Sequence, residues 1–166
     1  MKKIAIQGGK ASFHDIASHL FFDEPIELIE CATFEQVCKK LDTNDADYAF
    51  MAIENSIAAS ILLNYQLIQD YNFHIVGEQQ LRIVQNLIAL PGTNLKDITK
   101  VRSHYMALRQ CTDFLMQNPQ IEVEEYYDTA DSAKLVAEKQ LVGEAGIASA
   151  KAAEFYGLDI VAESIE

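Results

Sequence analysis

Basic residues are scarce in this sequence. Its 166 residues include 13 lysines and arginines against 25 aspartates and glutamates, which gives a formal net charge of -12. This negative field repels nucleic acid and anionic membrane surfaces over long range, so we expect neither as a partner. It also opposes an anionic small molecule, which would need local donors such as helix N-termini or hydroxyl groups.

Cysteines are few and long apolar runs are missing. Cys31, Cys38 and Cys111 lie far apart without a C-x-x-C pair, and their odd number argues against a disulfide scaffold. The N-terminus, MKKIAIQGG, has too few consecutive apolar residues for a signal peptide. No run approaches the length of a membrane span. We therefore predict a cytoplasmic protein.

Two kinds of cofactor-binding motif are absent as well. Gly8 and Gly9 follow the first predicted strand, but the G-x-G-x-x-G spacing of a dinucleotide-binding loop is missing. His19 and His74 have no neighbouring residues that would indicate a metal site. We expect neither a metal nor an organic cofactor.

The sequence does contain a core-forming composition and an alternation of strand and helix patterns. Hydrophobic residues make up 49% of the chain, which is enough for one domain or two small lobes. Apolar runs predict strands, and apolar residues three or four apart predict helices. Predicted strands cover residues 3–7, 26–29, 47–53, 101–103, 121–127, 146–148 and 158–162; predicted helices cover 13–20, 33–41, 57–68, 106–117, 130–137 and 149–156.

This alternation is interrupted once, after Asp70. Residues 73–77 and 81–90 are consecutive extended stretches without a helix between them. The regular alternation on either side predicts an α/β fold with two parallel sheets. We predict lobe 1 from residues 1–76 plus 158–166 and lobe 2 from residues 77–157, with a ligand cleft between the lobes.

Hydroxyl residues recur where a predicted strand meets a predicted helix. The central example is Ile53–Tyr65, IENSIAASILLNY, where an apolar run ends at Asn55 and Ser56 and a helical stripe follows at Ile57, Ile61, Tyr65 and Ile68. The five junction residues are Ser12, Ser56, Ser103, Thr129 and Ser149. We predict that Ser12, Ser56 and Thr129 cap helices. Because helix N-termini favour negative charge and parallel strands end at one edge, the junctions also predict a small-anion site.

Other polar residues near these junctions are open to two interpretations. His14 and His104 begin predicted helices, where they act either as neutral donors to a ligand or as surface histidines. Glu54 is interpreted as a structural group that hydrogen-bonds to the backbone, because its carboxylate would repel an anion. Thr33 and Gln36 have the spacing of a capping box and are assigned a structural role.

Six segments of the chain resemble the catalytic domain of the prephenate dehydratase family. They are Gly8–Ser18, Ala52–Ile68, Gly77–Leu90, Val101–Leu115, Asp128–Glu138 and Ala145–Glu166. The resemblance implies a two-lobed fold like that of the type II periplasmic binding proteins. It also implies the conversion of prephenate to phenylpyruvate in L-phenylalanine biosynthesis, without a cofactor. The substrate-binding residues that we predict are Ser12, Asn55, Ser56, Ser103, His104, Thr129 and Ala130.

The implied reaction removes a carboxylate as carbon dioxide and a ring hydroxyl as water. The protein would therefore hold a dianion, orient its ring and donate a proton to the leaving hydroxyl. An arogenate dehydratase, which acts on the transaminated substrate, is one alternative. A non-catalytic carboxylate-binding module of the same fold is another. A homodimer is the candidate assembly.

The sequence departs from the family pattern near the predicted site. Ala11 and Ala59 stand where glycine is usual, and His14 replaces a hydroxyl residue. Tyr105 and Met106 replace the proline and glutamine that usually follow Ser-His.

The family's Thr-Arg-Phe motif, whose threonine is regarded as the catalytic proton donor, is expected beyond Glu166. The catalytic residue within residues 1–166 is therefore unknown. We expect the parent reading frame to continue into this motif and then into an ACT domain. Phenylalanine would be a feedback effector only if that domain follows.

Overall fold

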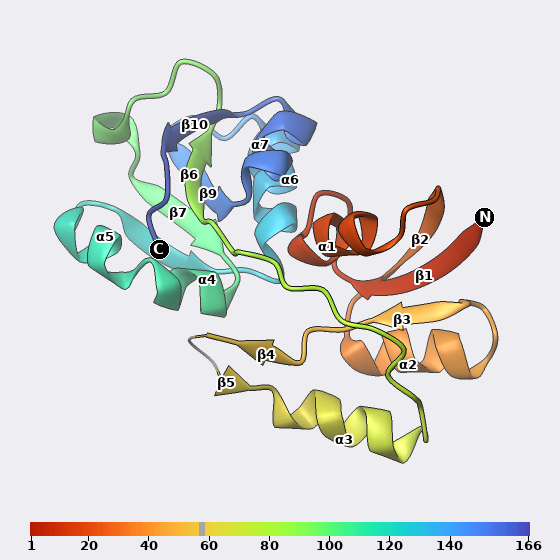
Figure 1. The fold of residues 1–166 in the computed structure, drawn as a ribbon. Coiled ribbons are helices and arrows are strands. Elements are labelled where there is room, and N and C mark those ends of the chain that lie inside the picture. Colours follow the sequence, from red (N-terminus) through yellow and green to blue (C-terminus); the bar gives the residue numbers. More distant parts are fainter. Residues whose placement is uncertain (57–58) are drawn as a thin grey trace. The chain divides into compact units, whose positions relative to one another are not determined.

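The computed structural model describes residues 1–56 and 59–166 (Figure 1). Residue contacts divide the chain into two units, Met1–Leu81 and Arg82–Glu166. The predicted boundary after residue 76 is therefore a few residues early. The assignment of residues 158–166 to lobe 1 is wrong, because β10 (Asp159–Ala162) pairs with β6 (Asn86–Ala89) inside the second unit.

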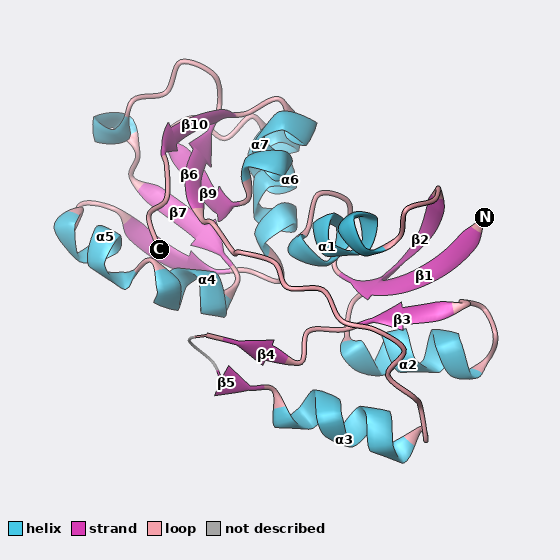
Figure 2. Ribbon diagram, in the orientation of Figure 1, coloured by secondary structure: helices cyan, strands magenta, loops and turns pink. Residues whose placement is uncertain are grey.

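The first unit contains a three-stranded parallel sheet (Figure 2). β1 (Lys2–Gln7) lies between β2 (Ile26–Cys31) and β3 (Tyr48–Phe50). α1 (Phe13–Phe21) and α2 (Phe34–Asp42) are the crossover helices that parallel pairing requires. Ile4, Ala5 and Ile6 are completely buried, as expected for a central strand that is covered on both faces.

A hairpin and a helix follow β3 in the first unit. β4 (Glu54–Asn55) pairs antiparallel with β5 (Ala59–Ser60), and α3 covers Leu62–Asp70. The predicted strand over residues 47–53 is thus confirmed only over the shorter β3, and the predicted helix begins later than expected, at Leu62. The apolar spacing of this stretch fits a helix, but periodicity cannot foresee the pairing of Glu54 with Ser60. Ile57 lies outside the described residues.

The second unit contains a five-stranded mixed sheet in the order β10-β6-β9-β7-β8. β7 (Lys100–Ser103), β8 (Glu122–Glu125) and β9 (Glu144–Ala148) are parallel, whereas β6 is antiparallel to both of its neighbours. The prediction of a purely parallel sheet is thus wrong for this unit. β6 breaks the pattern because irregular chain, rather than a crossover helix, leads from α3 to it.

Helices lie on both faces of the second sheet. α4 (Tyr105–Gln110) and α5 (Thr112–Gln117) replace the single helix predicted over residues 106–117 and meet at Cys111. They contribute to an apolar core with Leu87, Val101 and Ile147. α6 (Thr129–Lys139) packs on the opposite face, and α7 (Ala150–Tyr156) contacts α6.

The remaining short element is a 3-10 helix at Leu95–Asp97. No helix within residues 1–56 and 59–166 has both the length and the apolar character needed to cross a membrane.

Candidate functional site

Ser12 is a buried helix cap at the carboxyl-terminal edge of the first sheet. It follows β1 and is 1% exposed, and its Oγ accepts a hydrogen bond from the backbone N–H of Asp15 at 3.3 Å. The Asp15 carboxylate in turn accepts from the N–H of Ala11 at 2.6 Å. The prediction that Ser12 caps α1 is confirmed. Ala11 has a φ of 63°, a left-handed conformation that explains why glycine suits this position.

Asn55 and Ser56 occupy a hairpin instead of a helix start. Asn55 is half-buried in β4, and Ser56 is exposed in the turn that follows. α3 begins only at Leu62, without a side-chain cap, so the prediction that Ser56 caps a helix is wrong. The Glu54 carboxylate accepts a hydrogen bond from the Tyr65 hydroxyl at 3.3 Å. The hairpin that carries both candidate binding residues is thus bonded to α3 through Glu54.

Buried polar residues gather at one edge of the second sheet. β7, β8 and β9 are parallel and end there, and antiparallel β6 begins there, with Asn86 opposite Ala148. The buried polar residues at or next to these strand ends are Gln85, Asn86, Ser103, Thr129 and Ser149. The structure therefore brings the predicted residues of this unit, Ser103, His104, Thr129 and Ala130, to a common edge.

One helix cap at this edge, His104, was not assigned by the sequence interpretation. His104, not Ser103, caps α4, since its Nδ1 accepts from the N–H of Met106 at 3.2 Å. Ser103 is the last residue of β7, and its hydroxyl donates to the Ile147 carbonyl oxygen at 2.6 Å. The prediction that residues 101–103 form a strand is confirmed, and the Ser103 hydroxyl joins this strand to β9.

Asp128, not Thr129, caps α6. Its Oδ1 accepts from the N–H groups of Ala130 at 2.8 Å and Asp131 at 3.3 Å. Thr129 is the first helical residue and is 7% exposed. The Ala130 N–H is engaged by the cap, which leaves the Thr129 side chain as the better donor to a ligand. Ser149 caps α7 through the N–H of Ala152 at 3.0 Å.

The protonation of His104 and Asp128 follows from these contacts. Because Nδ1 of His104 accepts a hydrogen bond, a neutral imidazole carries its proton on Nε2, which can donate. Burial raises the pKa of Asp128 above its ordinary value of 3.8, and the hydrogen bond from the Ala130 N–H opposes this shift. Asp128 therefore carries its negative charge at a cost in the folded state.

This cost gives a test at Asp128. Asp128→Asn keeps the oxygen that caps α6 and removes the buried charge, so we expect a higher free energy of unfolding at pH 7. A carboxyl with a raised pKa destabilises the fold as the pH rises through that pKa. The gain in the free energy of unfolding should therefore disappear at a pH low enough to protonate Asp128. Thermal unfolding at pH 7 and at that low pH would measure the difference.

A control substitution shows whether the effect is specific to Asp128 or follows from removing any carboxylate in the first turn of α6. Asp131 also lies in this turn, where a negative charge interacts favourably with the helix dipole. Asp131→Asn should slightly lower the melting temperature at pH 7. Equal melting temperatures for Asp128→Asn and the parent protein at pH 7 would contradict the assigned cost.

The sequence interpretation missed three amides at the same edge. Gln85 is 2% exposed and its Nε2 donates to Oε1 of Gln110 at 3.0 Å. Its own Oε1 is a buried atom without a hydrogen-bond partner among the described residues. The Asn86 Oδ1 accepts from the N–H of Ser164 at 3.2 Å. The available signal was the polar pair Gln85 and Asn86 immediately before an apolar run.

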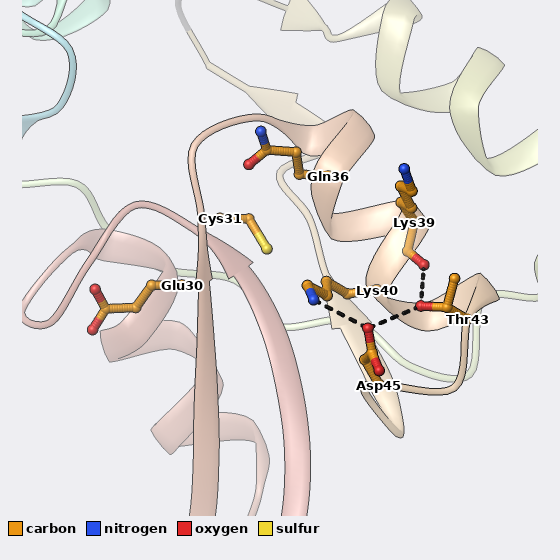
Figure 3. A pocket seen from close by; sticks show the side chains of 7 residues that line it. All are labelled: Glu30, Cys31, Gln36, Lys39, Lys40, Thr43 and Asp45. Carbon is orange, nitrogen blue, oxygen red and sulfur yellow. Dashed lines mark hydrogen bonds and ion pairs between the residues drawn. The ribbon is translucent and has the colours of Figure 1, made fainter.

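A separate hollow of about 280 Å³ lies between β2 and α2 in the first unit (Figure 3). Its lining residues are Glu30, Cys31, Gln36, Lys39, Lys40, Thr43 and Asp45. Lys40 Nζ lies 3.0 Å from Asp45 Oδ2, and the Thr43 hydroxyl donates to the same oxygen at 3.1 Å. The predicted substrate-binding residues are not among these seven, so this hollow is distinct from the predicted site.

Comparisons with known proteins found a matching family model and several similar proteins. A family model described as prephenate dehydratase matches residues 4–166. The chloroplastic arogenate dehydratase 5 of Arabidopsis thaliana is 36% identical over 165 residues, which are 99% of this chain and 39% of that protein. The chain thus spans about two fifths of the length of this relative.

Solved structures agree with this relationship. Prephenate dehydratase from Arthrobacter aurescens, in complex with L-Phe, has a TM-score of 0.84 and 25% identity, covering 98% of this chain and 55% of that chain. GqqA, described as a novel type of quorum quenching acylase, has a TM-score of 0.85 and 28% identity, and the match covers 99% of this chain and 60% of that chain.

A third solved structure bears on the fold alone. The periplasmic VFT2 domain of Bordetella pertussis BvgS has a TM-score of 0.51 and 17% identity, covering 98% of this chain and 74% of that chain. This likeness and the mixed α/β units confirm the predicted periplasmic-binding-protein type of fold. The ligand cleft between the lobes stays a prediction.

Proposed function

The chain belongs to the prephenate dehydratase family, and from this premise we propose that it binds prephenate and acts in its decarboxylating dehydration to phenylpyruvate. The observation that supports the proposal most directly is the polar edge of the second sheet. There the Thr129 hydroxyl, the His104 imidazole and the Gln110 amide belong to elements that begin or end near adjacent strand ends. Such donors suit carboxylates in a protein with a net charge of -12.

The proposed chemistry divides the work between binding and proton transfer. The residues of the polar edge in the second unit would hold a carboxylate and orient the ring for loss of carbon dioxide. Ser12, Asn55 and Ser56 of the first unit are proposed as further carboxylate-binding residues. The leaving hydroxyl requires a proton donor. The Thr-Arg-Phe tripeptide associated with that role does not occur in residues 1–166, so ligand binding is the first test.

Arogenate is the second candidate substrate. It is supported by the 36% identity to arogenate dehydratase 5, which exceeds the 25% identity to the solved prephenate dehydratase from Arthrobacter aurescens. The two substrates differ in a keto or an amino group on the side chain. Parallel assays with prephenate and arogenate decide between them, and binding without turnover of either would favour the non-catalytic module.

Acylase activity is the reaction named for one solved neighbour. Hydrolysis of an acyl group by a serine requires a hydroxyl that is activated by a neighbouring base. Ser103 instead donates its hydroxyl proton to the Ile147 carbonyl oxygen, and the Ser12 oxygen accepts from a backbone N–H. These contacts favour capping and substrate binding over nucleophilic catalysis.

Ser56→Ala provides a clean test of substrate binding. Ser56 is exposed and caps no helix, so its removal should leave the stability of the protein unchanged. If the hydroxyl contacts a carboxylate, we expect the affinity for phenylpyruvate to fall by about 1 to 2 kcal/mol. Titration calorimetry on the folded variant measures this change.

Thr43→Ala is the control for Ser56→Ala, since it removes an exposed hydroxyl outside the proposed site. Its phenylpyruvate affinity should equal that of the parent protein. An unchanged affinity for Ser56→Ala would remove Ser56 from the binding residues. Cytoplasmic location and a homodimer stay predictions; the three free, buried cysteines are compatible with a reducing compartment.

A further inference from the structure

α3 is unusual because its buried position is occupied by an amide. Asn64 is buried, with 2% of its surface exposed. In contrast, the neighbouring Leu62 and Leu63 are 74% and 73% exposed. A surface helix normally turns apolar residues inward and polar residues outward. In the first turn of α3 this pattern is inverted. The burial of the Asn64 side chain must therefore be explained by a specific contact.

The Asn64 side chain is bonded to the segment that leads into the hairpin. Its Nδ2 donates to the carbonyl oxygen of Ala52 at 2.7 Å. Ala52 lies between β3 and β4 and belongs to neither strand, so its carbonyl oxygen takes no part in the strand pairing of β3 or β4. A buried carbonyl without a partner is costly, and this bond supplies the partner.

Two further bonds join the start of α3 to the same segment. The N–H of Ile61 donates to the carbonyl oxygen of Ile53 at 2.8 Å, and the Tyr65 hydroxyl donates to the Glu54 carboxylate at 3.3 Å. Three consecutive residues, Ala52, Ile53 and Glu54, are thus each held by the beginning of one helix. The next residue along the chain is Asn55.

We propose that Asn64 is a positioning residue, which fixes the Ala52–Glu54 segment and thereby sets the place of Asn55 for ligand binding. The proposal rests on the proposed function, because Asn55 is one of its binding residues. Of the three bonds, the one from Asn64 is the shortest and comes from the most buried side chain. Polar residues at buried positions are expected where function constrains a site more than packing does.

Asn64→Leu tests this role without weakening the helix. Leucine has a better helix propensity than asparagine and a similar size, so α3 itself should be retained, and the free energy of unfolding should fall only by the loss of the bond to the Ala52 carbonyl oxygen. The donor to Ala52 is lost, and misplacement of Asn55 should lower the affinity for phenylpyruvate about tenfold, with a larger fall in kcat/KM wherever turnover is measurable. Leu63→Ala, at an exposed neighbouring position, should leave both unchanged.

Asn64→Asp adds a pH-dependent readout that a purely structural role would not give. The shape of the side chain is kept, but a carboxyl group donates a hydrogen bond only when it is protonated. Burial favours the protonated form, so the affinity defect should be large near about pH 8 and shrink toward about pH 5. The defect of Asn64→Leu should be the same at both pH values.

Amide hydrogen exchange separates this proposal from the proposed function. Loss of the Asn64 bond should speed exchange of the Ile61 N–H, which donates to Ile53. If the parent protein binds neither substrate nor product, the proposed function fails, and exchange alone decides whether Asn64 fixes the segment. Unchanged exchange in both Asn64 variants, or faster exchange with unchanged phenylpyruvate affinity, would overturn the positioning role.

Discussion

Gly146→Ala is expected to lower the free energy of unfolding of the second unit by about 2 to 3 kcal/mol, at the upper end of the usual cost of overpacking. A Cβ on Gly146 would lie 2.9 Å from Ser132 Oγ and 3.3 Å from the backbone nitrogen of Ala133. Both residues are completely buried in α6, and the Ser132 hydroxyl is held by the Thr129 carbonyl oxygen at 2.6 Å. The helix cannot easily move away, so strand and helix must separate.

Chemical denaturation combined with hydrogen exchange of the β7 and β9 amides would measure this loss. Gly146→Val should have a still larger effect, since it places more atoms in the same contact. Gly9→Ala is the control, because its Cβ would meet the mobile carboxylate end of Glu30 at 3.2 Å. A Gly146→Ala variant as stable as Gly9→Ala would show that α6 does not pack against β9 as closely as described.

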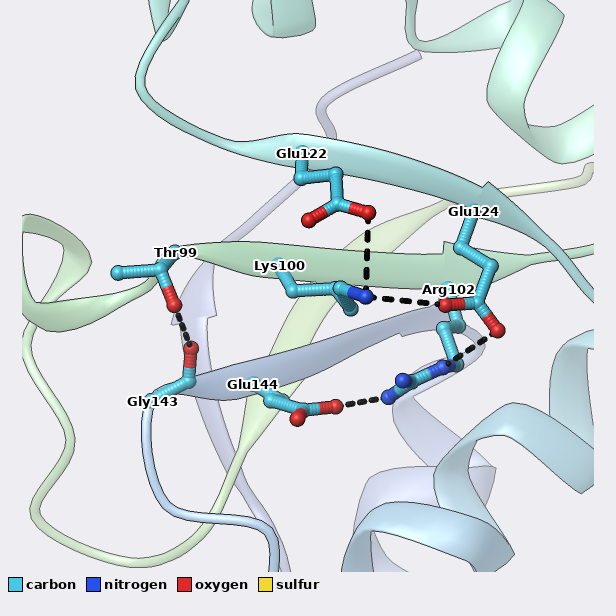
Figure 4. A network of polar contacts seen from close by, with 7 residues as sticks. All are labelled: Thr99, Lys100, Arg102, Glu122, Glu124, Gly143 and Glu144. Atoms are coloured by element: carbon cyan, nitrogen blue, oxygen red, sulfur yellow. Dashed lines mark hydrogen bonds and ion pairs between the residues drawn. The ribbon is translucent and has the colours of Figure 1, made fainter.

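Arg102→Met is expected to destabilise the second unit by about 2 kcal/mol, between the values typical of exposed and of buried ion pairs. The Arg102 side chain is 13% exposed and pairs with Glu124 at 3.1 Å and with Glu144 (Figure 4). Methionine keeps much of the aliphatic packing but leaves these carboxylates without the guanidinium. Lys100 remains 3.2 Å from Glu124, which limits the loss.

A double variant tests whether the destabilisation comes from an unpaired carboxylate. Adding Glu144→Gln to Arg102→Met removes the charge that lost its partner, so the double variant should recover part of the lost stability. Denaturation of the two single variants and the double variant gives the coupling energy. Strict additivity of the single changes would contradict a direct interaction between Arg102 and Glu144.

The same network gives a pH dependence. The hydrogen bond from Arg102, followed by that from Lys100, holds the pKa of Glu124 below its ordinary value of 4.5. A carboxyl with a lowered pKa stabilises the fold above that ordinary value and loses this contribution as the pH falls through its folded pKa. The stability difference between the parent protein and Arg102→Met should therefore narrow below about pH 4.5.

Local signals in the sequence determined most of the element types. The apolar run of β1 and the capping box of α2 depend on residues only a few positions apart. Thr33 Oγ1 accepts from the N–H of Gln36 at 3.2 Å, and the Gln36 side chain accepts from the N–H of Ala32 at 3.0 Å. The sequence also placed Ser12, Ser103, His104 and Thr129 next to strand ends, because a strand followed by a helix leaves its polar residues there.

Only the tertiary structure decided which of these residues cap helices and which serve other contacts. The Ser103 hydroxyl bonds to Ile147, and β10 pairs with β6, across separations that no local pattern records. The hairpin at Asn55 and the inward turn of Asn64 likewise depend on partners in other elements. Hydrophobic periodicity specifies which face of a segment is buried; hydrogen-bond pairing and close packing depend on the neighbours that the folded chain brings to that face.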